Sequence, residues 1–195
     1  MLRPVPVLAV LVIVTGAAFL LFGPQPLPSK APALEIRTGP FAHDVYEGFL
    51  PVLARRWKGF SRPEDEQFGL SAALPDGALG LLGSPRIDTG GTFNTKGYEN
   101  QAHLAASWRG YLFGSPLFVE GTFGGGLHDG HLLDGQKPDR NMGCRINFYE
   151  SLSVGVTFWN GWSLAISYEH MSNADLCPPN EGLSNMGFRI IAPIE

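Results

Sequence analysis

The sequence predicts an all-β protein: an eight-stranded antiparallel β-barrel that crosses a membrane, preceded by an N-terminal apolar helix. Three observations favour this fold class. The chain has 25 glycines and 13 phenylalanines but only four methionines, and turn-forming residues recur at short intervals. Several segments alternate between apolar and polar side chains, which is the periodicity of strands. Their polar faces also carry charges, as the lumen face of a membrane barrel does.

The length, net charge and cysteine content of the chain narrow the classes of protein to which it can belong. Its 195 residues are enough for one domain. The net charge of -4 gives no reason to expect nucleic acid as a partner. The two cysteines fit an oxidising compartment outside the cytoplasm.

Residues 1–33 form the predicted leader. An apolar run from Val5 to Phe22 follows Arg3, and a Pro-rich spacer leads to Ala33. Apolar cores of secretory signals span about 7–15 residues, and this run is slightly longer. We favour an exported chain cleaved near Ala33, with an uncleaved anchor as the alternative. Residues 34–195 then form the barrel.

Eight strands are expected along the rest of the chain. The first three have weak patterns, whereas the last five have apolar faces whose alternation agrees. The polar segment after the first strand, residues 47–65, has the composition of a short amphipathic helix. The expected strands span roughly 34–46, 66–74, 86–95, 100–112, 116–126, 141–158, 161–173 and 183–194.

Turn residues fix the register of the last hairpins. If residues 159–161 form a three-residue loop, Gly161 takes the left-handed position that glycine favours. Leu152 then faces Tyr168, and the neighbouring cross-strand pairs on that face are apolar as well. We therefore expect this face to lie against lipid, with residues 127–140 and 174–182 as extracellular loops.

The opposite face carries charges that need partners inside a narrow barrel. A loop at residues 113–116 places Arg109 opposite Glu120 in the lumen. The other charged side chains predicted to point inward are Arg145, Glu169 and Arg189.

A possible nucleophile and base lie on the lipid-facing wall. His170 and Ser172 are two residues apart on one strand, so they share a face. Serine needs a base to remove its proton, and Asn173 is a candidate donor to an oxyanion. A histidine and serine near a strand end are also common as polar rim residues, so the pattern by itself is a weak signal.

The surrounding motif resembles the lipid A 3-O-deacylase family and its acyloxyacyl hydrolase relatives. The resemblance rests on His-Met-Ser-Asn-Ala at 170–174 and Pro-Asn-Glu-Gly at 179–182, with looser similarity at 81–86, 118–121 and 128–130. It implies an eight-stranded outer-membrane barrel that hydrolyses an acyl ester of lipid A. It also implies that His170 is the base, that Ser172 is the nucleophile and that Asn173 helps to form the oxyanion hole.

The chain departs from this family at one position. The family acid falls fourteen residues after the histidine, where this chain has Ser184. Two carboxylates are candidate substitutes. Glu150 is predicted to lie opposite His170 on the lipid face, unless a β-bulge turns it inward. Glu181 lies on the adjacent loop, where a solvated charge is the simpler interpretation.

The residues leave two further features undecided, a possible disulfide and a possible metal site. The register brings Cys144 close to Cys177, so a disulfide is the first expectation and two free thiols the second. The loop at residues 128–134 contains His128, Asp129, His131 and Asp134. We expect these to be solvated rather than to bind a metal.

Two functional hypotheses follow. The first is an exported outer-membrane ester hydrolase that acts on lipid A within lipopolysaccharide, needs no cofactor and contacts membrane lipids. The second is a catalytically inactive barrel that serves as a structural or lipid-binding subunit of a membrane assembly. A homodimer is compatible with either.

Overall fold

The computed structural model describes residues 32–194 except 60–62, 76–77, 137–138 and 159. The predicted N-terminal helix falls on residues 1–31 and lies outside the described residues. Eight strands make up most of the described chain, at β1 (Leu34–Ala42), β2 (Pro63–Ala73), β3 (Arg86–Asn94), β4 (Gln101–Tyr111), β5 (Leu117–His128), β6 (Ile146–Thr157), β7 (Ser163–Ser172) and β8 (Leu183–Ile194).

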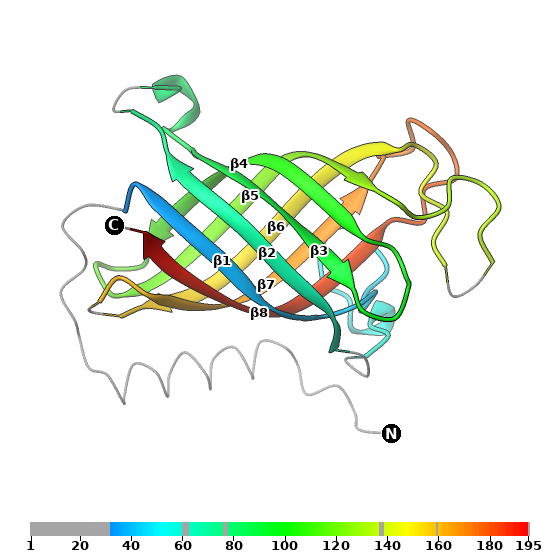
Figure 1. Ribbon diagram of the computed structural model, residues 1–195, viewed down its shortest axis with the longest axis horizontal. Coiled ribbons are helices and arrows are strands. Elements are labelled where there is room, and N and C mark those ends of the chain that lie inside the picture. The colour runs from blue at the N-terminus through cyan, green and yellow to red at the C-terminus, as the bar shows by residue number, and fades with distance from the viewer. Residues whose placement is uncertain (1–31, 60–62, 76–77, 137–138, 159, 195) are drawn as a thin grey trace.

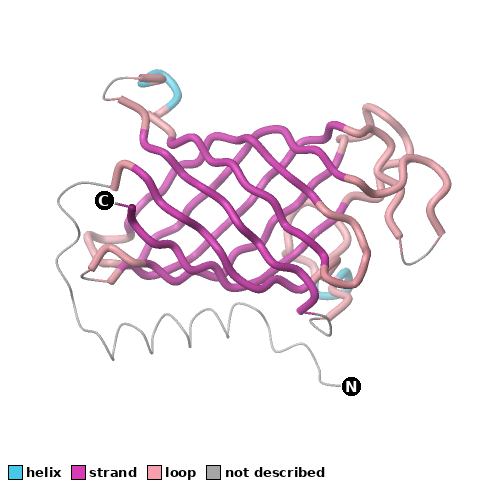
Figure 2. Tube along the Cα trace, viewed as in Figure 1, coloured by secondary structure: helices cyan, strands magenta, loops and turns pink. Residues whose placement is uncertain are grey.

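The strands close into a barrel in which sequence neighbours pair and β8 returns to β1. All pairings are antiparallel, so successive connections alternate between the two ends of the barrel (Figures 1 and 2). The start of β1 and the end of β8 lie at one end. The longer connections 129–145 and 173–182 lie at the other, which we call the loop end. The eight predicted strands are thus confirmed.

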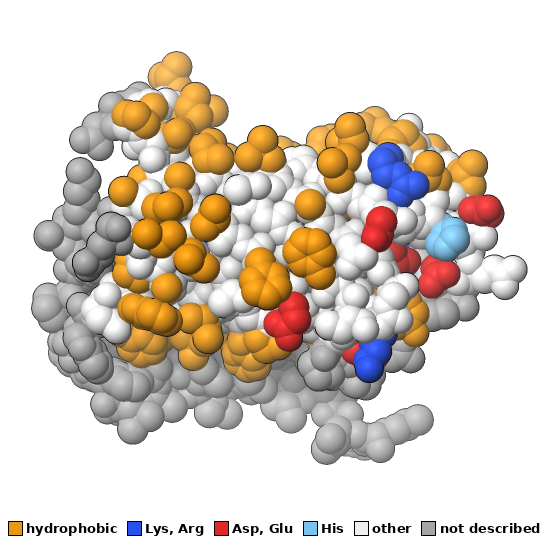
Figure 3. Space-filling model, in the orientation of Figure 1, with side chains coloured by type: hydrophobic (Ala, Val, Ile, Leu, Met, Phe, Trp, Pro, Cys, Tyr) orange, Lys and Arg blue, Asp and Glu red, His pale blue; other side chains and the backbone are white. Residues whose placement is uncertain are grey.

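The faces of the barrel have the polarity of a membrane protein. Large apolar side chains lie exposed on the outer wall, including Phe68 (54%), Leu104 (64%) and Ile146 (70%). Figure 3 shows many of them over one side, with most of the visible charged side chains toward the loop end. No helix among the described residues is long and apolar enough to cross a membrane.

Charged side chains fill the lumen and pair there. Glu120 is fully buried, and its carboxylate lies 2.8 Å from Arg37 and 2.8 Å from Arg109. Arg37 also reaches Asp88 at 2.6 Å, and Arg109 reaches Glu35 at 2.9 Å. Burial of several charges is tolerated because each has an opposite charge within reach. The predicted pairing of Arg109 with Glu120 is confirmed.

The predicted register of the β6–β7 hairpin is also confirmed. Val156 pairs with Leu164, and Leu152 pairs with Tyr168. Gly161 adopts a positive φ of 80° in the turn, as expected for glycine there.

The prediction was wrong at the start of the β6 segment. That strand begins at Ile146 and not at residue 141. Arg145 is therefore exposed at the loop end, where it donates to the carbonyls of His128 and Gly130 instead of pointing into the lumen. The apolar–polar alternation continues into residues 141–145, which lie outside the strand. Alternation in a sequence does not indicate where strand pairing ends.

The connection between β1 and β2 differs most from expectation. The amphipathic helix predicted at 47–65 is absent from the described part of this segment, which contains one turn of 3-10 helix at Ala54–Arg56. The connection instead packs on the outer wall near the loop end. Tyr46 and Trp57 contact a cluster that includes Tyr168 and Met186, both on the outer face of the sheet.

Candidate active site

A row of three polar residues crosses the outer wall near the loop end. His170 on β7 pairs with Glu150 on β6 and with Ser184 on β8. The ladder of β6 with β7 shows no register shift, so the bulge that would have turned Glu150 inward does not form. Since directly opposed side chains on one face lie about 5 Å apart at Cβ, the strand register alone brings the three together.

His170 has a neutral partner at the position of the family acid. Its Nδ1 lies 2.8 Å from the Ser184 hydroxyl. The Ser184 oxygen lies 2.9 Å from the hydroxyl of Tyr168, which donates to the Gly48 carbonyl at 2.8 Å. Gly48 belongs to the β1–β2 connection, so this contact ties the connection to the row.

The β1–β2 connection covers the row from the lipid side. His170 is only 4% exposed and Ser184 1%, although both lie on the outer wall. The Phe49 ring packs edge-on against the imidazole at a centroid distance of 6.1 Å. The sequence contained no signal for this cover, because contacts between a loop and distant strands leave no periodic pattern.

A cavity of about 310 Å³ opens beside His170 on the outer wall. One carboxylate oxygen of Glu150, Oε2, is buried there without a hydrogen-bond partner among the described residues. The lining is otherwise mainly apolar, and an apolar cleft with a few polar groups is the usual form of a ligand site. The lining side chains include Phe49, Leu50, Trp108, Phe123, Leu152 and Tyr168.

Ser172 lies on the same outer face as His170, two residues further along β7. It pairs with Phe148 and is half-buried. No hydrogen bond joins Ser172 to His170 within the described part of the chain. Nucleophile and base are often loosely arranged until substrate binds, so this spacing is compatible with catalysis.

A second cavity adjoins this part of the wall. Its volume is about 330 Å³, and it is lined by Phe123, Phe148, Asn173 and Leu176 among others. Phe123 lines both cavities, and its ring stacks on that of Phe148 at 6.1 Å. Together the two cavities place apolar surface on both sides of Phe123.

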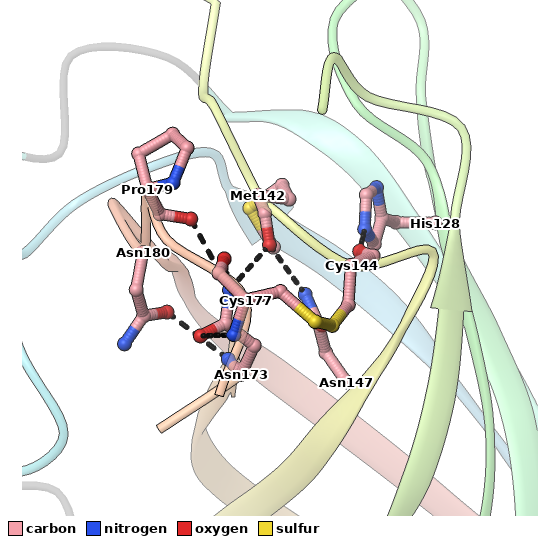
Figure 4. The surroundings of a disulfide bond; sticks show 8 residues. All are labelled: His128, Met142, Cys144, Asn147, Asn173, Cys177, Pro179 and Asn180. Carbon is pink, nitrogen blue, oxygen red and sulfur yellow. Dashed lines mark hydrogen bonds between the residues drawn. A yellow bond between two sulfur atoms is a disulfide. The ribbon is translucent and has the colours of Figure 1, made fainter. Parts of the chain in front are cut away.

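The Asn173 side chain is hydrogen-bonded within the loop end. Its side-chain Nδ2 donates to the carbonyls of Met142 and Cys177, each at 2.8 Å, and of Pro179 at 3.2 Å (Figure 4). Its backbone N–H donates to Asn180. All its donors therefore hold the loop that follows β7. The motif could not reveal these loop contacts, and the oxyanion role of Asn173 stays a prediction.

The predicted disulfide between Cys144 and Cys177 is present (Figure 4). The two Cα atoms lie 5.4 Å apart, within the usual range for disulfides. It joins the segment before β6 to the loop after β7, at the edge of the cavity lined by Asn173.

Glu181 connects the same loop to the segment before β6. Its carboxylate accepts from the backbone N–H of Asn141, and its own N–H donates to the Asn141 carbonyl. These two bonds join the loop ends before β6 and β8.

The other polar residues of the loop end form structural contacts. His128 lies 2.6 Å from the Cys144 carbonyl, and the exposed His131 lies 3.5 Å from Asp139. Across the described ranges, no group of three or more histidine, cysteine or acidic side chains is arranged to hold a metal ion.

One buried histidine at the loop end is held between two carboxylates. His43 lies 3.0 Å from Asp65 and 3.1 Å from Glu99. Burial alone would lower the pKa of His43, but the two hydrogen bonds outweigh it and raise the pKa to about 9. His43 is therefore positively charged at neutral pH and links the end of β1 to β2 and to the β3–β4 hairpin.

Comparison with known proteins agrees with this architecture. A 56-residue stretch is 36% identical to the lipid A deacylase PagL of Pseudomonas aeruginosa, covering 29% of this chain and 32% of that protein. The match thus spans about a third of the length of the curated relative. The crystal structure of the outer membrane enzyme PagL superposes over 83% of this chain and 99% of its own, with a TM-score of 0.53 and 18% identity, which supports the fold. A family model described as lipid A 3-O-deacylase (PagL) matches residues 54–191, well over half of the chain, so this protein belongs to that family.

Proposed function

We propose that this protein is an outer-membrane serine ester hydrolase that removes an acyl chain from lipid A by 3-O-deacylation. The observation that carries the proposal is the position of Ser172 and His170 on the outer wall, beside apolar cavities. That wall faces the membrane, so the ester within reach of these side chains is one carried by a membrane lipid. Membership of the deacylase family supports the same reaction.

In the proposed mechanism, Ser172 attacks the acyl carbonyl while Nε2 of His170 takes the hydroxyl proton. The tetrahedral intermediate collapses as His170 passes that proton to the departing sugar oxygen. A water molecule then attacks the acyl-enzyme, His170 again acting as base, and the fatty acid leaves. Every step uses side chains of this chain, and the proposal includes no cofactor.

Glu150 is the proposed source of negative charge. It lies opposite His170 on the neighbouring strand and lines the same cavity. In a poorly polar site, a nearby carboxylate stabilises the imidazolium even without a direct hydrogen bond. Glu181 is the weaker candidate because its carboxylate binds the Asn141 backbone.

The proposed setting is the outer membrane of a Gram-negative cell, reached by export with residues 1–33 as signal or anchor. The partners are then lipopolysaccharide and the surrounding membrane lipids. The hydroxyl at Ser184 favours a second candidate function, since it replaces the family carboxylate. That alternative is an inactive barrel that serves as a structural or lipid-binding subunit, alone or as a homodimer.

Mass spectrometry of lipid A tests the proposal. Membranes expressing the full chain should lose one hydroxyacyl group from lipid A, and membranes expressing Ser172→Ala should not. Ser115→Ala, in a turn at the opposite end of the barrel, is the matched serine control and should behave like the wild type. Unchanged lipid A with a folded wild-type barrel would favour the inactive subunit.

A further inference from the structure

We propose that Ser184 and Tyr168 form a neutral hydrogen-bond relay, anchored on the Gly48 carbonyl, that fixes His170 as the tautomer with its hydrogen on Nδ1. The proposal rests on the proposed function for the assignment of His170 as base. Ser184 and Tyr168 are positioning residues in it, because they act through His170.

The number of hydrogens determines the direction of the relay. Three short contacts need one hydrogen each: His170 to Ser184, Ser184 to Tyr168, and Tyr168 to Gly48. The Gly48 carbonyl can only accept, so the Tyr168 hydroxyl donates to it. Tyr168 is also the donor in its contact with Ser184, so its one hydrogen serves Gly48 or Ser184, and the contact with His170 is left to a hydrogen on Nδ1.

The alternative arrangement of hydrogens gives the same tautomer. Ser184 also lies 3.4 Å from the Gly48 carbonyl. If Ser184 donates there, Tyr168 donates to Ser184, and Nδ1 must again carry the hydrogen of its own contact. Donation from Ser184 to Nδ1 would reverse the tautomer, and it would leave only two hydrogens for the four contacts of this cluster, where the Nδ1–H tautomer supplies three.

The Nδ1–H tautomer is the one that catalysis needs. A neutral imidazole with its hydrogen on Nδ1 has its lone pair on Nε2, ready to accept the serine proton. Because Ser184 is 1% exposed and Tyr168 5%, lipid and water do not compete for these contacts. The β1–β2 connection therefore takes part in orienting the base through a single backbone carbonyl.

The relay also explains how the chain can lack the family acid. The acid of a catalytic triad both fixes the tautomer and stabilises the imidazolium. A hydroxyl can perform the first task but carries no charge for the second. In this chain the two tasks are divided between flanking strands, with Ser184 on β8 orienting His170 and Glu150 on β6 supplying charge.

Nitrogen-15 NMR of the histidine-labelled full chain in detergent micelles tests the tautomer without reference to activity. The His170 signals are those lost in His170→Gln. We expect Nδ1 to carry the hydrogen in the wild type, and Ser184→Ala to lose that preference. Ser184→Thr, which restores a hydroxyl, should regain it. An Nε2–H tautomer in the wild type, or Nδ1–H persisting in both Ser184→Ala and Tyr168→Phe, would overturn the relay.

Kinetics of lipid A deacylation provide the second measurement. Tyr168→Phe removes one hydroxyl and keeps the ring, so kcat should fall about 3- to 10-fold, the equivalent of one hydrogen bond, with KM nearly unchanged. Tyr111→Phe, which loses a hydroxyl contact to Thr157 at the other end of the barrel, is the control. A change in KM alone would contradict a positioning role. If no variant or wild type is active, the proposed function fails while the NMR result still decides the relay.

Discussion

At the scale of single residues, the unusual feature is a carboxylate on a lipid-facing wall. An unpaired charge facing lipid is costly, so acidic residues there commonly serve a function. Glu150 occupies such a position beside His170, with one oxygen buried and unpartnered among the described residues. Its place in the row agrees with the proposed electrostatic role.

Glu150→Gln tests that role with little change in shape. If the carboxylate stabilises the His170 imidazolium, the substitution should lower kcat about 100-fold, the lower end of the range that general acid–base catalysis contributes. Conversion of lipid A by the purified protein in micelles measures the effect. Glu66→Gln is the control, because Glu66 also lies on the outer wall but is exposed and belongs to β2. Equal activity of the two variants would exclude Glu150 as the source of charge.

At the scale of elements, the loop end is held by cross-links between connections that are distant in sequence. The disulfide and the donors of Asn173 join the segment before β6 to the loop after β7. The β1–β2 connection contacts β7 and β8 through Gly48 and Phe49. These connections between strands contact one another and the neighbouring strands, and together they shape the site.

Cys144→Ser with Cys177→Ser should loosen the loop after β7. The two cysteines are 33 positions apart in the sequence, and closing a loop of that size stabilises a protein by roughly 3–4 kcal/mol. We expect faster cleavage of residues 173–182 by added protease and a lower denaturant midpoint. The wild type treated with reductant is the control and should behave like the double variant. Unchanged protection of the loop would show that hydrogen bonds alone hold it.

His43 should make the stability of the loop end depend on alkaline pH. Because its folded pKa of about 9 exceeds the usual value near 6.5, its stabilising contribution is complete below pH 6.5. The contribution is lost as the pH rises through 9. Between those values, the wild type should lose about 2–3 kcal/mol more unfolding free energy than His43→Gln. Denaturant titrations in lipid vesicles measure the unfolding free energies of the wild type and of His43→Gln at each pH. If the two free energies changed equally with pH, the raised pKa of His43 would be contradicted.

At the scale of the whole molecule, stability depends on a charged lumen inside an apolar wall. Glu120 lies at the centre of this network, paired with arginines from β1 and β4. The outer wall meets lipid, so packing between wall side chains is limited, and the lumen contacts join strands across the barrel. Removing one buried partner leaves the others uncompensated.

Glu120→Ala should destabilise the barrel by about 3–5 kcal/mol, since it removes one of the two carboxylates that Arg37 and Arg109 share and leaves an excess of buried positive charge. Equilibrium unfolding in urea with lipid vesicles measures the change. Glu47→Ala is the control, because the Glu47 side chain is 60% exposed and its ion pairs, with Lys58 at 3.5 Å and Arg140 at 4.0 Å, lie outside the lumen network. Similar urea midpoints for Glu120→Ala and Glu47→Ala would mean that water in the lumen compensates for the lost Glu120 carboxylate.

The sequence by itself determined the strand order, the register and the outward direction of the site. Period-two alternation and turn chemistry are local properties, so they placed Glu150 opposite His170 and Cys144 near Cys177. Tertiary structure alone decided what surrounds the histidine. The cover by Phe49, the relay through Tyr168 to Gly48 and the loop contacts of Asn173 join segments far apart in the chain or lie in irregular loops. Such contacts follow no period, and they form only when the closed barrel fixes where each connection can lie.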